Sequence, residues 1–542
     1  MKKRITALLL AAVMLLAALA GCGPANNGGD SGNSDGGNSS SNGGGNTDRA
    51  LKIRKVNSLA STDYDVVTYT EDMSILSDNV FQGLYGMDEA GGGYCKLLAK
   101  DVAISEDGIT YTITLVDATF QNGDAVKASD VKFSYDRAMA TERFNYVTDM
   151  IDSVEVQDDK TVVFTLKYPY SAIDHTFFSI KITSEREITE AGASYGTTAH
   201  TAATGPYAIS KYDPAGGLTL TAYDGYWGGA PAIKTVEYVL ITEDSAAVIA
   251  YENGEIDFMN NAPTSDWDAL VSASGDNNAV LKGNSIRTLY INYQSTTNNS
   301  ILANELVRKA ICYAVDKNAI NTVATSGLGT TSDEYILSDY VATAPEAKDF
   351  ETYSYNPEKA KELLLQAGYT EADLAAGVSV GTLTTYGPAT GEKAKAAQVV
   401  QANLKAVGLL CEIDVADSNI NVPKLKAHDF DLGIYGDSGN YDFNNIRQQV
   451  LVDGGYCIVD LTGNPGELDY SKVESLLADG IAETDIAARK AIYTELWSMV
   501  ADTATMHPYM NMPVAVVWSS ALNPGDGAQS PTYYHLNTFS WK

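Results

Sequence analysis

Residues 192–196, Gly-Ala-Ser-Tyr-Gly, form a G-x-S-x-G motif, the pattern that presents a nucleophilic serine in many hydrolases. That chemistry requires a strand directly before the serine and a helix directly after it, so that a sharp turn exposes the hydroxyl. Here the preceding segment, 184–191, has the composition of a helix, and Thr-Thr-Ala-His-Thr follows the motif. We therefore interpret the motif as a chance match, and a secreted hydrolase with Ser194 as its nucleophile stays as an alternative of a different class.

The histidines and cysteines do not have the spacing of a metal or redox centre. The five histidines form neither H-x-x-x-H nor H-E-x-x-H, and the four cysteines after residue 22 form no C-x-x-C pair. No phosphate-binding G-x-x-x-x-G-K motif occurs. Cys312 lies in an apolar run and is expected in a core. The sequence therefore shows no catalytic set, and we expect no cofactor, no metal and no enzyme activity.

The charge balance excludes nucleic acid as a partner. The precursor has 37 basic and 69 acidic residues, a formal net charge of -32. Loss of Lys2, Lys3 and Arg4 with a signal peptide would bring the chain to -35. Such a surface repels polyanions and keeps a secreted protein soluble.

The elements that must position a binding site alternate between strand and helix. Segment 109–115 alternates apolar and polar residues, as does 161–166, so both are predicted strands of a sheet-rich part within about 90–200. Asp130 is the predicted N-cap of a helix over 131–139. These signals place the chain in the α/β class.

Helix followed by strand recurs between about 286 and 505. Asn356, Pro357 and Glu358 are typical of a helix start, and Gly368 of its end. A second helix is predicted over 397–407, with a strand directly after it. A helical apolar face is also predicted over 306–315.

The amino terminus is predicted to be a secretion signal. A basic start precedes an apolar run from residue 5 to residue 20, which is shorter than the ~20 residues that cross a bilayer. Leu19-Ala20-Gly21-Cys22 resembles a bacterial lipobox, which implies cleavage after residue 21 and lipidation of Cys22. Residues 23–49 are Gly-, Asn-, Ser- and Asp-rich, and are expected to be a disordered linker. The expected location is the extracytoplasmic face of a cell membrane, through a lipid anchor.

Seven motifs in a fixed order resemble the extracellular solute-binding proteins of family 5, which serve ABC importers of the peptide and nickel type. Each motif is weak alone, but together they span more than half of the chain. They are residues 97–115, 122–138, 204–214, 226–229, 253–257, 307–320 and 355–369.

The resemblance implies a bilobal periplasmic-binding-protein-like fold of the Venus-flytrap, cluster C type, with an extra inserted subdomain. Lobe I would consist of 50–90, 201–285 and 511–542, the inserted subdomain of 91–200 and lobe II of 286–510. Ligand contacts made only in the closed form would drive hinge closure. The implied partners are a small peptide-like solute and the permease and ATPase subunits of an importer, with the receptor itself a monomer.

The resemblance also implies ligand-binding residues in lobe II. Peptide-binding members hold the α-amino group with an aspartate in a segment like G-W-x-A-D-Y, which corresponds here to residues 436–442. Asn440 takes the place of that aspartate and Asp437 the place of the tryptophan, beside Tyr441 and Asp442. An ammonium group in a cleft needs a carboxylate, so Asp437 or Asp442 must compensate if the solute carries an amine.

Two further ligand contacts are predicted outside that segment. In lobe I, an acidic contact of the peptide binders falls at about Tyr69, with Thr70 and Glu71 beside it. In lobe II, Tyr386 begins a loop after a predicted strand. An oligopeptide is the leading solute class; an oligosaccharide or a metal chelate is the alternative within the same fold, and a surface sensor lipoprotein is a further alternative.

Overall fold

The computed structural model describes residues 49–67, 70–87, 93–295, 301–338, 341–438, 442–452, 457–525 and 534–542. The predicted signal peptide, Cys22 and the linker to residue 48 lie outside the described residues, as do Tyr69, Asn440 and Tyr441. Among the described residues, no helix has both the length and the apolar character needed to cross a membrane.

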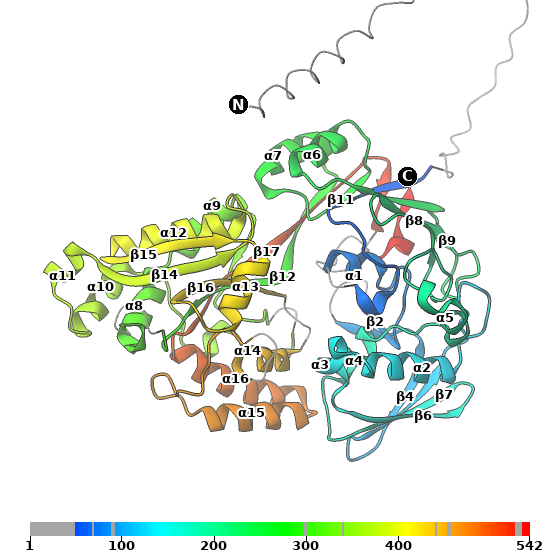
Figure 1. Cartoon of the computed structure of the whole chain (residues 1–542), viewed down its shortest axis with the longest axis horizontal. Helices are drawn as coiled ribbons and strands as arrows, with labels where there is room; N and C mark the ends of the chain where they lie inside the picture. Colours follow the sequence, from blue (N-terminus) through cyan, green and yellow to red (C-terminus); the bar gives the residue numbers. More distant parts are fainter. Residues whose placement is uncertain are drawn as a thin grey trace, which may run out of the picture. The chain divides into compact units, whose positions relative to one another are not determined.

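Within the described residues, eleven strands form one sheet that runs through the body (Figure 1). Their order is β15-β14-β16-β12-β17-β11-β1-β10-β9-β8, and β13 pairs with β17. The strands are β1 Leu51–Lys55, β8 Tyr207–Tyr212, β9 Gly217–Ala222, β10 Thr235–Leu240, β11 Phe258–Asn260, β12 Asn278–Ile291, β13 Thr330–Thr331, β14 Val378–Tyr386, β15 Leu409–Ala416, β16 Leu432–Ser438 and β17 Met506–Trp518.

The long antiparallel strands β12 and β17 connect the two ends of this sheet. Residues 278–282 pair with 513–517, where β17 also pairs with β11. Residues 286–290 pair with 506–511, where β12 also pairs with β16. The register is irregular between these stretches. The two strands therefore carry two well-paired halves joined by a short irregular link.

We call the part that contains β14, β15 and β16 the second lobe. β14 runs parallel to both of its neighbours, and helices pack around the three strands to bury a core of aliphatic residues. The helices of this lobe are α8 Glu305–Ala314, α9 Lys317–Thr325, α10 Pro357–Gln366, α11 Glu371–Ala376, α12 Glu392–Ala406, α13 Ser418–Lys426, α14 Arg447–Val450, α15 Tyr470–Ala482 and α16 Ile486–Asp502.

The local helix signals of this lobe are confirmed, with one shift. The Asn356 side chain accepts from the Lys359 N–H at the start of α10, Pro357 is the first residue of the helix, and Gly368 follows it with a φ of 100°. Cys312 is fully buried as predicted. The helix predicted to begin at residue 397 begins instead at Glu392, whose carboxylate favours the first turn and pairs with another element.

We call the part that holds the strand order β4-β5-β7-β6 the inserted subdomain, which has a core of its own. The predicted strands at 109–115 and 161–166 are confirmed in it, as β5 and β7. Its elements are β4 Ala99–Ile104, β5 Thr110–Leu115, β6 Ile151–Asp158, β7 Thr161–Leu166, α2 Ala128–Met139, α3 Asn145–Thr148 and α4 Ile173–Ser179.

The predicted N-cap role of Asp130 is wrong. Helix α2 begins at Ala128, so Asp130 lies inside its first turn and accepts from the Lys127 N–H at 3.0 Å. Its other oxygen accepts from the Glu185 N–H at 3.1 Å. Asp130 therefore accepts from the N–H before α2 with one oxygen and holds the start of a second helix, α5 (Glu185–Ala191), with the other.

We call the remaining part, around β1 and β8–β11, the first lobe. β1 lies parallel to β10 and β11, and the buried residues form two clusters that include residues from β17. Its further elements are α1 Thr70–Leu76, α6 Asp244–Glu252, α7 Trp267–Ser274, β2 Tyr85–Met87, β3 Tyr94–Lys96, β18 Leu522–Asn523 and β19 Ser540–Trp541. Two α/β halves joined by β12 and β17, with an added subdomain, confirm the expected bilobal fold.

Candidate functional site

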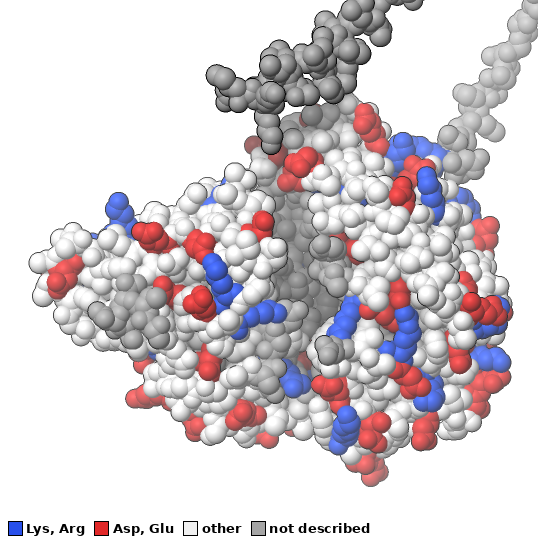
Figure 2. All heavy atoms as spheres, in the orientation of Figure 1, with Lys and Arg blue, Asp and Glu red and all other residues white. Residues whose placement is uncertain are grey.

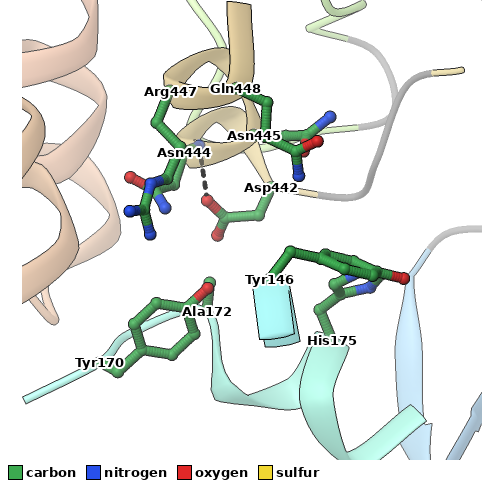
Figure 3. Close-up of a pocket in the computed structure, with 9 residues that line it drawn as sticks. All are labelled: Tyr146, Tyr170, Ala172, His175, Asp442, Asn444, Asn445, Arg447 and Gln448. Carbon is green, nitrogen blue, oxygen red and sulfur yellow. Dashed lines mark hydrogen bonds between the residues drawn. The ribbon is translucent and has the colours of Figure 1, made fainter. Parts of the chain in front are cut away.

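A pocket lies between the inserted subdomain and the short helices that follow β16, at residues 443–450 (Figure 3). We call it the cleft pocket. The free space inside it that water-sized molecules can occupy is about 30 Å³, and its mouth opens to solvent. Figure 2 shows the surface hollowed between the second lobe and the rest of the body. The lining residues are Tyr146, Tyr170, Ala172 and His175 on one side, and Asp442, Asn444, Asn445, Arg447 and Gln448 on the other.

Two hydrogen bonds tie the inserted subdomain to the second lobe near this pocket. The backbone N–H of Ser171 donates to the Ile481 carbonyl at 3.0 Å, and the Ser171 hydroxyl donates to the same oxygen at 2.8 Å. Ile481 also packs against the apolar core of the inserted subdomain. The segment that supplies Tyr170 and Ala172 is therefore held against helix α15.

Asp442 is anchored by an arginine of helix α16. The two Arg489 guanidinium nitrogens lie 2.7 and 2.8 Å from the two carboxylate oxygens, and the Asn444 N–H donates to the carboxylate at 2.8 Å. Arg489 is itself buried, and its Nε donates to the Gly480 carbonyl at 2.8 Å. This bidentate pair compensates part of the Asp442 charge, and Asp442 sets the start of the short helix of residues 443–446.

Arg447 and Asn444 carry unused hydrogen-bonding groups on the same side of the pocket. Among the described residues, the Arg447 guanidinium has no hydrogen-bond or ion-pair partner. Asn444 is 3% exposed, and its side-chain oxygen has no partner either. Figure 3 shows the two side chains next to each other. Buried polar groups ordinarily find partners, so these groups are available to a ligand.

The opposite wall carries tyrosines and a neutral histidine. Burial and the charge of Asp442 raise the pKa of Tyr170, so its hydroxyl stays protonated and can donate. Burial and the charge of Lys181 lower the pKa of His175 to about 4. Beside it, desolvation and the charge of Asp442 raise the pKa of Asp174 to about 6, although part of Asp174 stays exposed. Two carboxylates from two parts of the fold thus influence each other here.

A second group of polar residues gathers where the strands of the second lobe end, and we call it the sheet-edge cluster. Its members are Arg287, Tyr386, Glu392, Lys393 and Tyr509, from β12, β14, α12 and β17. Ligands of open α/β sheets bind at the carboxyl ends of the strands. The predicted site residue Tyr386 is therefore at such an edge, because it is the last residue of β14.

Two cations and one anion meet in the sheet-edge cluster. Arg287 Nε lies 2.8 Å from Glu392 Oε1, and Lys393 Nζ lies 3.1 Å from the same oxygen and 4.5 Å from the centre of the Tyr386 ring. Burial alone would raise the pKa of Glu392, but the two cations lower it. The buried Tyr509 hydroxyl finds no partner in the part of the chain that the structure describes. The cluster therefore has a surplus positive charge and an unused hydroxyl.

Gly436 lies opposite Arg287 on the neighbouring strand β16. A Cβ there would lie 2.5 Å from the Arg287 guanidinium, closer than such contacts occur. The Tyr386 hydroxyl lies 3.4 Å from the Gly436 nitrogen. The first residue of the predicted 436–442 segment therefore makes room for the cluster.

The remaining predicted site residues have different environments. Glu71 accepts from the Val56 N–H at 2.7 Å and the Asn57 N–H at 2.9 Å, so its carboxylate holds a loop of the first lobe. Thr70 is the first residue of α1, and Asp437 pairs through its backbone with Ile286, but neither side chain is described.

Two predicted site residues belong to the polar groups described above. Asp442 lines the cleft pocket, and Tyr386 belongs to the sheet-edge cluster. Sequence reasoning missed Arg447, Asn444, Tyr170, Arg287 and Glu392. Their neighbours in the fold lie up to hundreds of residues away in the sequence, and no motif marks them. An arginine that follows the 436–442 segment was the only available signal for Arg447.

Ser194 lacks the surroundings of a nucleophile. It lies in a short turn directly after helix α5, rather than after a strand, and its hydroxyl donates to the Ala191 carbonyl at 2.7 Å. This confirms that the G-x-S-x-G pattern is not a nucleophile elbow. In the part of the chain that the structure describes, no group of three or more His, Cys, Asp and Glu residues is arranged to hold a metal ion.

Comparison with protein families decides the class. The family of bacterial extracellular solute-binding proteins, family 5, matches residues 94–449, which is more than half of the chain. The chain belongs to this family. Its members are binding proteins. The matched range includes most of the inserted subdomain and strands β12, β14 and β16. It also includes the cleft pocket and the sheet-edge cluster, except for Tyr509 on β17.

Individual relatives agree with this assignment. The glutathione-binding protein GsiB of Pectobacterium atrosepticum is 29% identical over 353 residues, which cover 63% of this chain and 65% of that protein. The ABC transporter substrate-binding protein CtaP of Listeria monocytogenes has a similar structure, with a TM-score of 0.78 and 21% identity, over 91% of this chain and 99% of the other. NikA of Brucella suis, solved with Fe(III)-EDTA, also has a TM-score of 0.78 at 21% identity, over 91% and 100%.

Proposed function

We propose that this protein is the extracytoplasmic receptor of an ABC importer and that it captures short peptides or peptide-like solutes. The observation that carries the proposal is a pocket whose walls come from the inserted subdomain and from the second lobe, in a member of a solute-binding family. A solute that touches both walls favours their approach, since those contacts exist together only when the walls are close.

The choice of a peptide-like solute is supported by the chemistry of both polar groups and by the glutathione-binding relative. Glutathione is a tripeptide, and that relative matches this chain over nearly two thirds of each length. Guanidinium, amide and phenol groups, such as those of Arg447, Asn444 and Tyr170, complement carboxylates and peptide bonds. No step of this function needs covalent chemistry, so the protein acts as a receptor and not as an enzyme.

The proposed location and organisation follow from the sequence. The lipobox-like segment would leave Cys22 as the lipidated first residue, and residues 23–49 would tether the body to the membrane. The proposed domains are lobe I (50–90, 201–285, 511–542), the inserted subdomain (91–200) and lobe II (286–510). Substitution of Cys22 by Ser would be expected to move the protein from the membrane fraction to the soluble extracytoplasmic fraction.

The solute class is tested by mass spectrometry and calorimetry. Native mass spectrometry of the protein as isolated shows whether a solute is retained, and its mass after denaturation identifies it. Titrations with a pool of di- to pentapeptides, with glutathione, with Fe(III)-EDTA and with oligosaccharides then rank the classes. Binding of peptides or glutathione is the expected result. Binding of only the chelate or only a sugar would contradict the peptide-like solute and leave the receptor function intact.

A further inference from the structure

Arg447 is a cation without a counter-charge in a chain that has 69 acidic residues and 37 basic ones. It lines the cleft pocket, and none of the described residues pairs with it. An arginine that lies unpaired in a pocket has lost part of its hydration, which is unfavourable. A ligand anion that pairs with the arginine would offset this loss.

The nearest carboxylate on the same side does not supply that anion. Both oxygens of Asp442 are engaged by Arg489, and one also accepts from the Asn444 N–H. His175 on the opposite wall is neutral at pH 7, because its pKa is about 4. Asp174 is close enough for Asp442 to raise its pKa, but Asp174 does not line the pocket. Among the described residues that line the pocket, the guanidinium therefore faces no free anion.

Asn444 adds a hydrogen-bond acceptor beside this cation. Its side chain is 97% buried, and the side-chain oxygen finds no donor among the described residues. The carboxyl-terminal residue of a peptide offers the complementary pair within one residue: a carboxylate that accepts, and the N–H of the last peptide bond, which donates.

Tyr170 approaches from the other wall. Its hydroxyl points across the pocket toward the side that carries Asp442 and Arg447 (Figure 3). The residue is 6% exposed, and the hydroxyl is not among the buried groups that lack access to solvent. A carboxylate on Arg447 can therefore also accept from the inserted subdomain, which links the two walls.

We propose that the cleft pocket binds the carboxyl-terminal residue of the solute, with its carboxylate on Arg447 and its amide N–H on the Asn444 side-chain oxygen. Tyr170 donates to the same carboxylate. This inference rests on the proposed function and narrows it to solutes with a free carboxylate at the peptide end.

The test compares two tripeptide pools that differ only in a free or an amidated carboxyl terminus. The wild-type protein and the Arg447→Ala, Asn444→Ala and Arg186→Ala variants are incubated with both pools, and the retained peptides are counted by mass spectrometry. Arg186 is a matched control, because it is an exposed arginine of helix α5, paired with Asp124 away from the pocket.

The wild-type protein and Arg186→Ala are expected to retain free-carboxylate peptides about 10- to 100-fold better than amidated ones, the range for one charged hydrogen-bonded contact. Arg447→Ala is expected to bring that ratio close to one, and Asn444→Ala to weaken retention of both pools. Thermal melting confirms that each variant is folded.

Two results would overturn the inference. Equal retention of both pools by the wild-type protein, or an unchanged ratio in Arg447→Ala, would remove the carboxylate subsite and leave peptide capture intact. Retention of neither pool by a protein that retains a neutral oligosaccharide would contradict both the subsite and the proposed solute class.

Discussion

At the scale of single residues, Glu392 is the one described anion that pairs with both Arg287 and Lys393 in the sheet-edge cluster. The three side chains are 12–21% exposed, so water screens their charges poorly. We expect Glu392→Gln to lower the free energy of unfolding by about 3 kcal/mol, because two poorly solvated cations would then repel each other. Urea unfolding measures this change.

An exposed glutamate of β15 provides the control for that variant. Glu412 has no ion pair among the described residues, and Glu412→Gln is expected to change the unfolding free energy by less than about 0.5 kcal/mol. If both variants unfolded at the same urea concentration as the wild type, the cluster would not depend on its carboxylate.

Asp174 gives a prediction with a definite pH dependence. Its pKa in the folded protein is about 6, against 3.8 for an ordinary aspartate, so the folded state binds the proton more tightly than the unfolded state. The ionised carboxylate therefore destabilises the fold above pH 6, and this cost disappears as the pH falls toward 4.

The Asp174→Asn variant should accordingly melt about 1–2 °C higher than the wild type at pH 7.5, a small effect since part of Asp174 is exposed to solvent. The difference should shrink as the pH falls through 6 and vanish only below pH 3.8, where the carboxyl is protonated in both the folded and the unfolded state. Asp152→Asn, on an exposed position of β6, is the matched control. A melting difference that stayed constant with pH would mean that the charge of Asp174 is not the cause.

At the scale of elements, β12 and β17 are the strands that join the two lobes, and Gly283 lies in their irregular link. A Cβ at Gly283 would lie 2.3 Å from the backbone oxygen of Met512. We expect Gly283→Ala to push the strands apart, to cost about 1–3 kcal/mol and to change solute affinity. Val280→Ala, on the same strand with a 39% exposed side chain, should do neither.

Unfolding in urea and titration with the solute retained by the isolated protein measure the two effects of Gly283→Ala separately. A variant with wild-type stability and affinity would show that the link tolerates added volume. Loss of stability with unchanged affinity would show that Gly283 serves only the packing of the two strands. The strands that join the lobes would then not influence solute binding.

At the scale of the whole molecule, the proposed mechanism requires that solute binding draws the cleft walls together. We expect the radius of gyration of the isolated protein to fall when the solute is added, by small-angle scattering, and to stay larger in Arg447→Ala at the same solute concentration. A radius unchanged by a solute that calorimetry shows to be bound would contradict hinge closure.

Much of the local structure followed from the sequence because its causes are local. The start of α10 at Asn356 and Pro357 depends on hydrogen bonds within one turn, and the strands β5 and β7 depend on alternation between neighbours. Asp130 shows the limit of such reasoning: its residue type is typical of a helix start, but α2 begins at Ala128 and one oxygen of Asp130 accepts from the distant Glu185 N–H.

The site was only partly predictable, because its interactions join distant residues. Asp442 stood out as an acid near the family's amine position, but its pairing with Arg489 turns it from a free carboxylate into an anchor. Glu71 is likewise an acid of the expected type, but its carboxylate is not free to bind a ligand, because it already accepts hydrogen bonds from backbone N–H groups. The residue type identifies a candidate ligand-binding residue, whereas its hydrogen-bond and ion-pair partners in the fold decide whether its charge is free to bind a ligand.

The amino-acid order by itself determined the α/β class, the ordered motifs of a solute-binding family and the absence of a nucleophile elbow at Ser194. Periodicity, caps and turn residues act within a few positions, so they can be found along a chain. Only the tertiary structure decided that Arg447 and Asn444 face Tyr170 with unused hydrogen-bonding groups. The two sides of that pocket lie more than 250 residues apart in the sequence, and burial and pairing are properties of the folded surroundings.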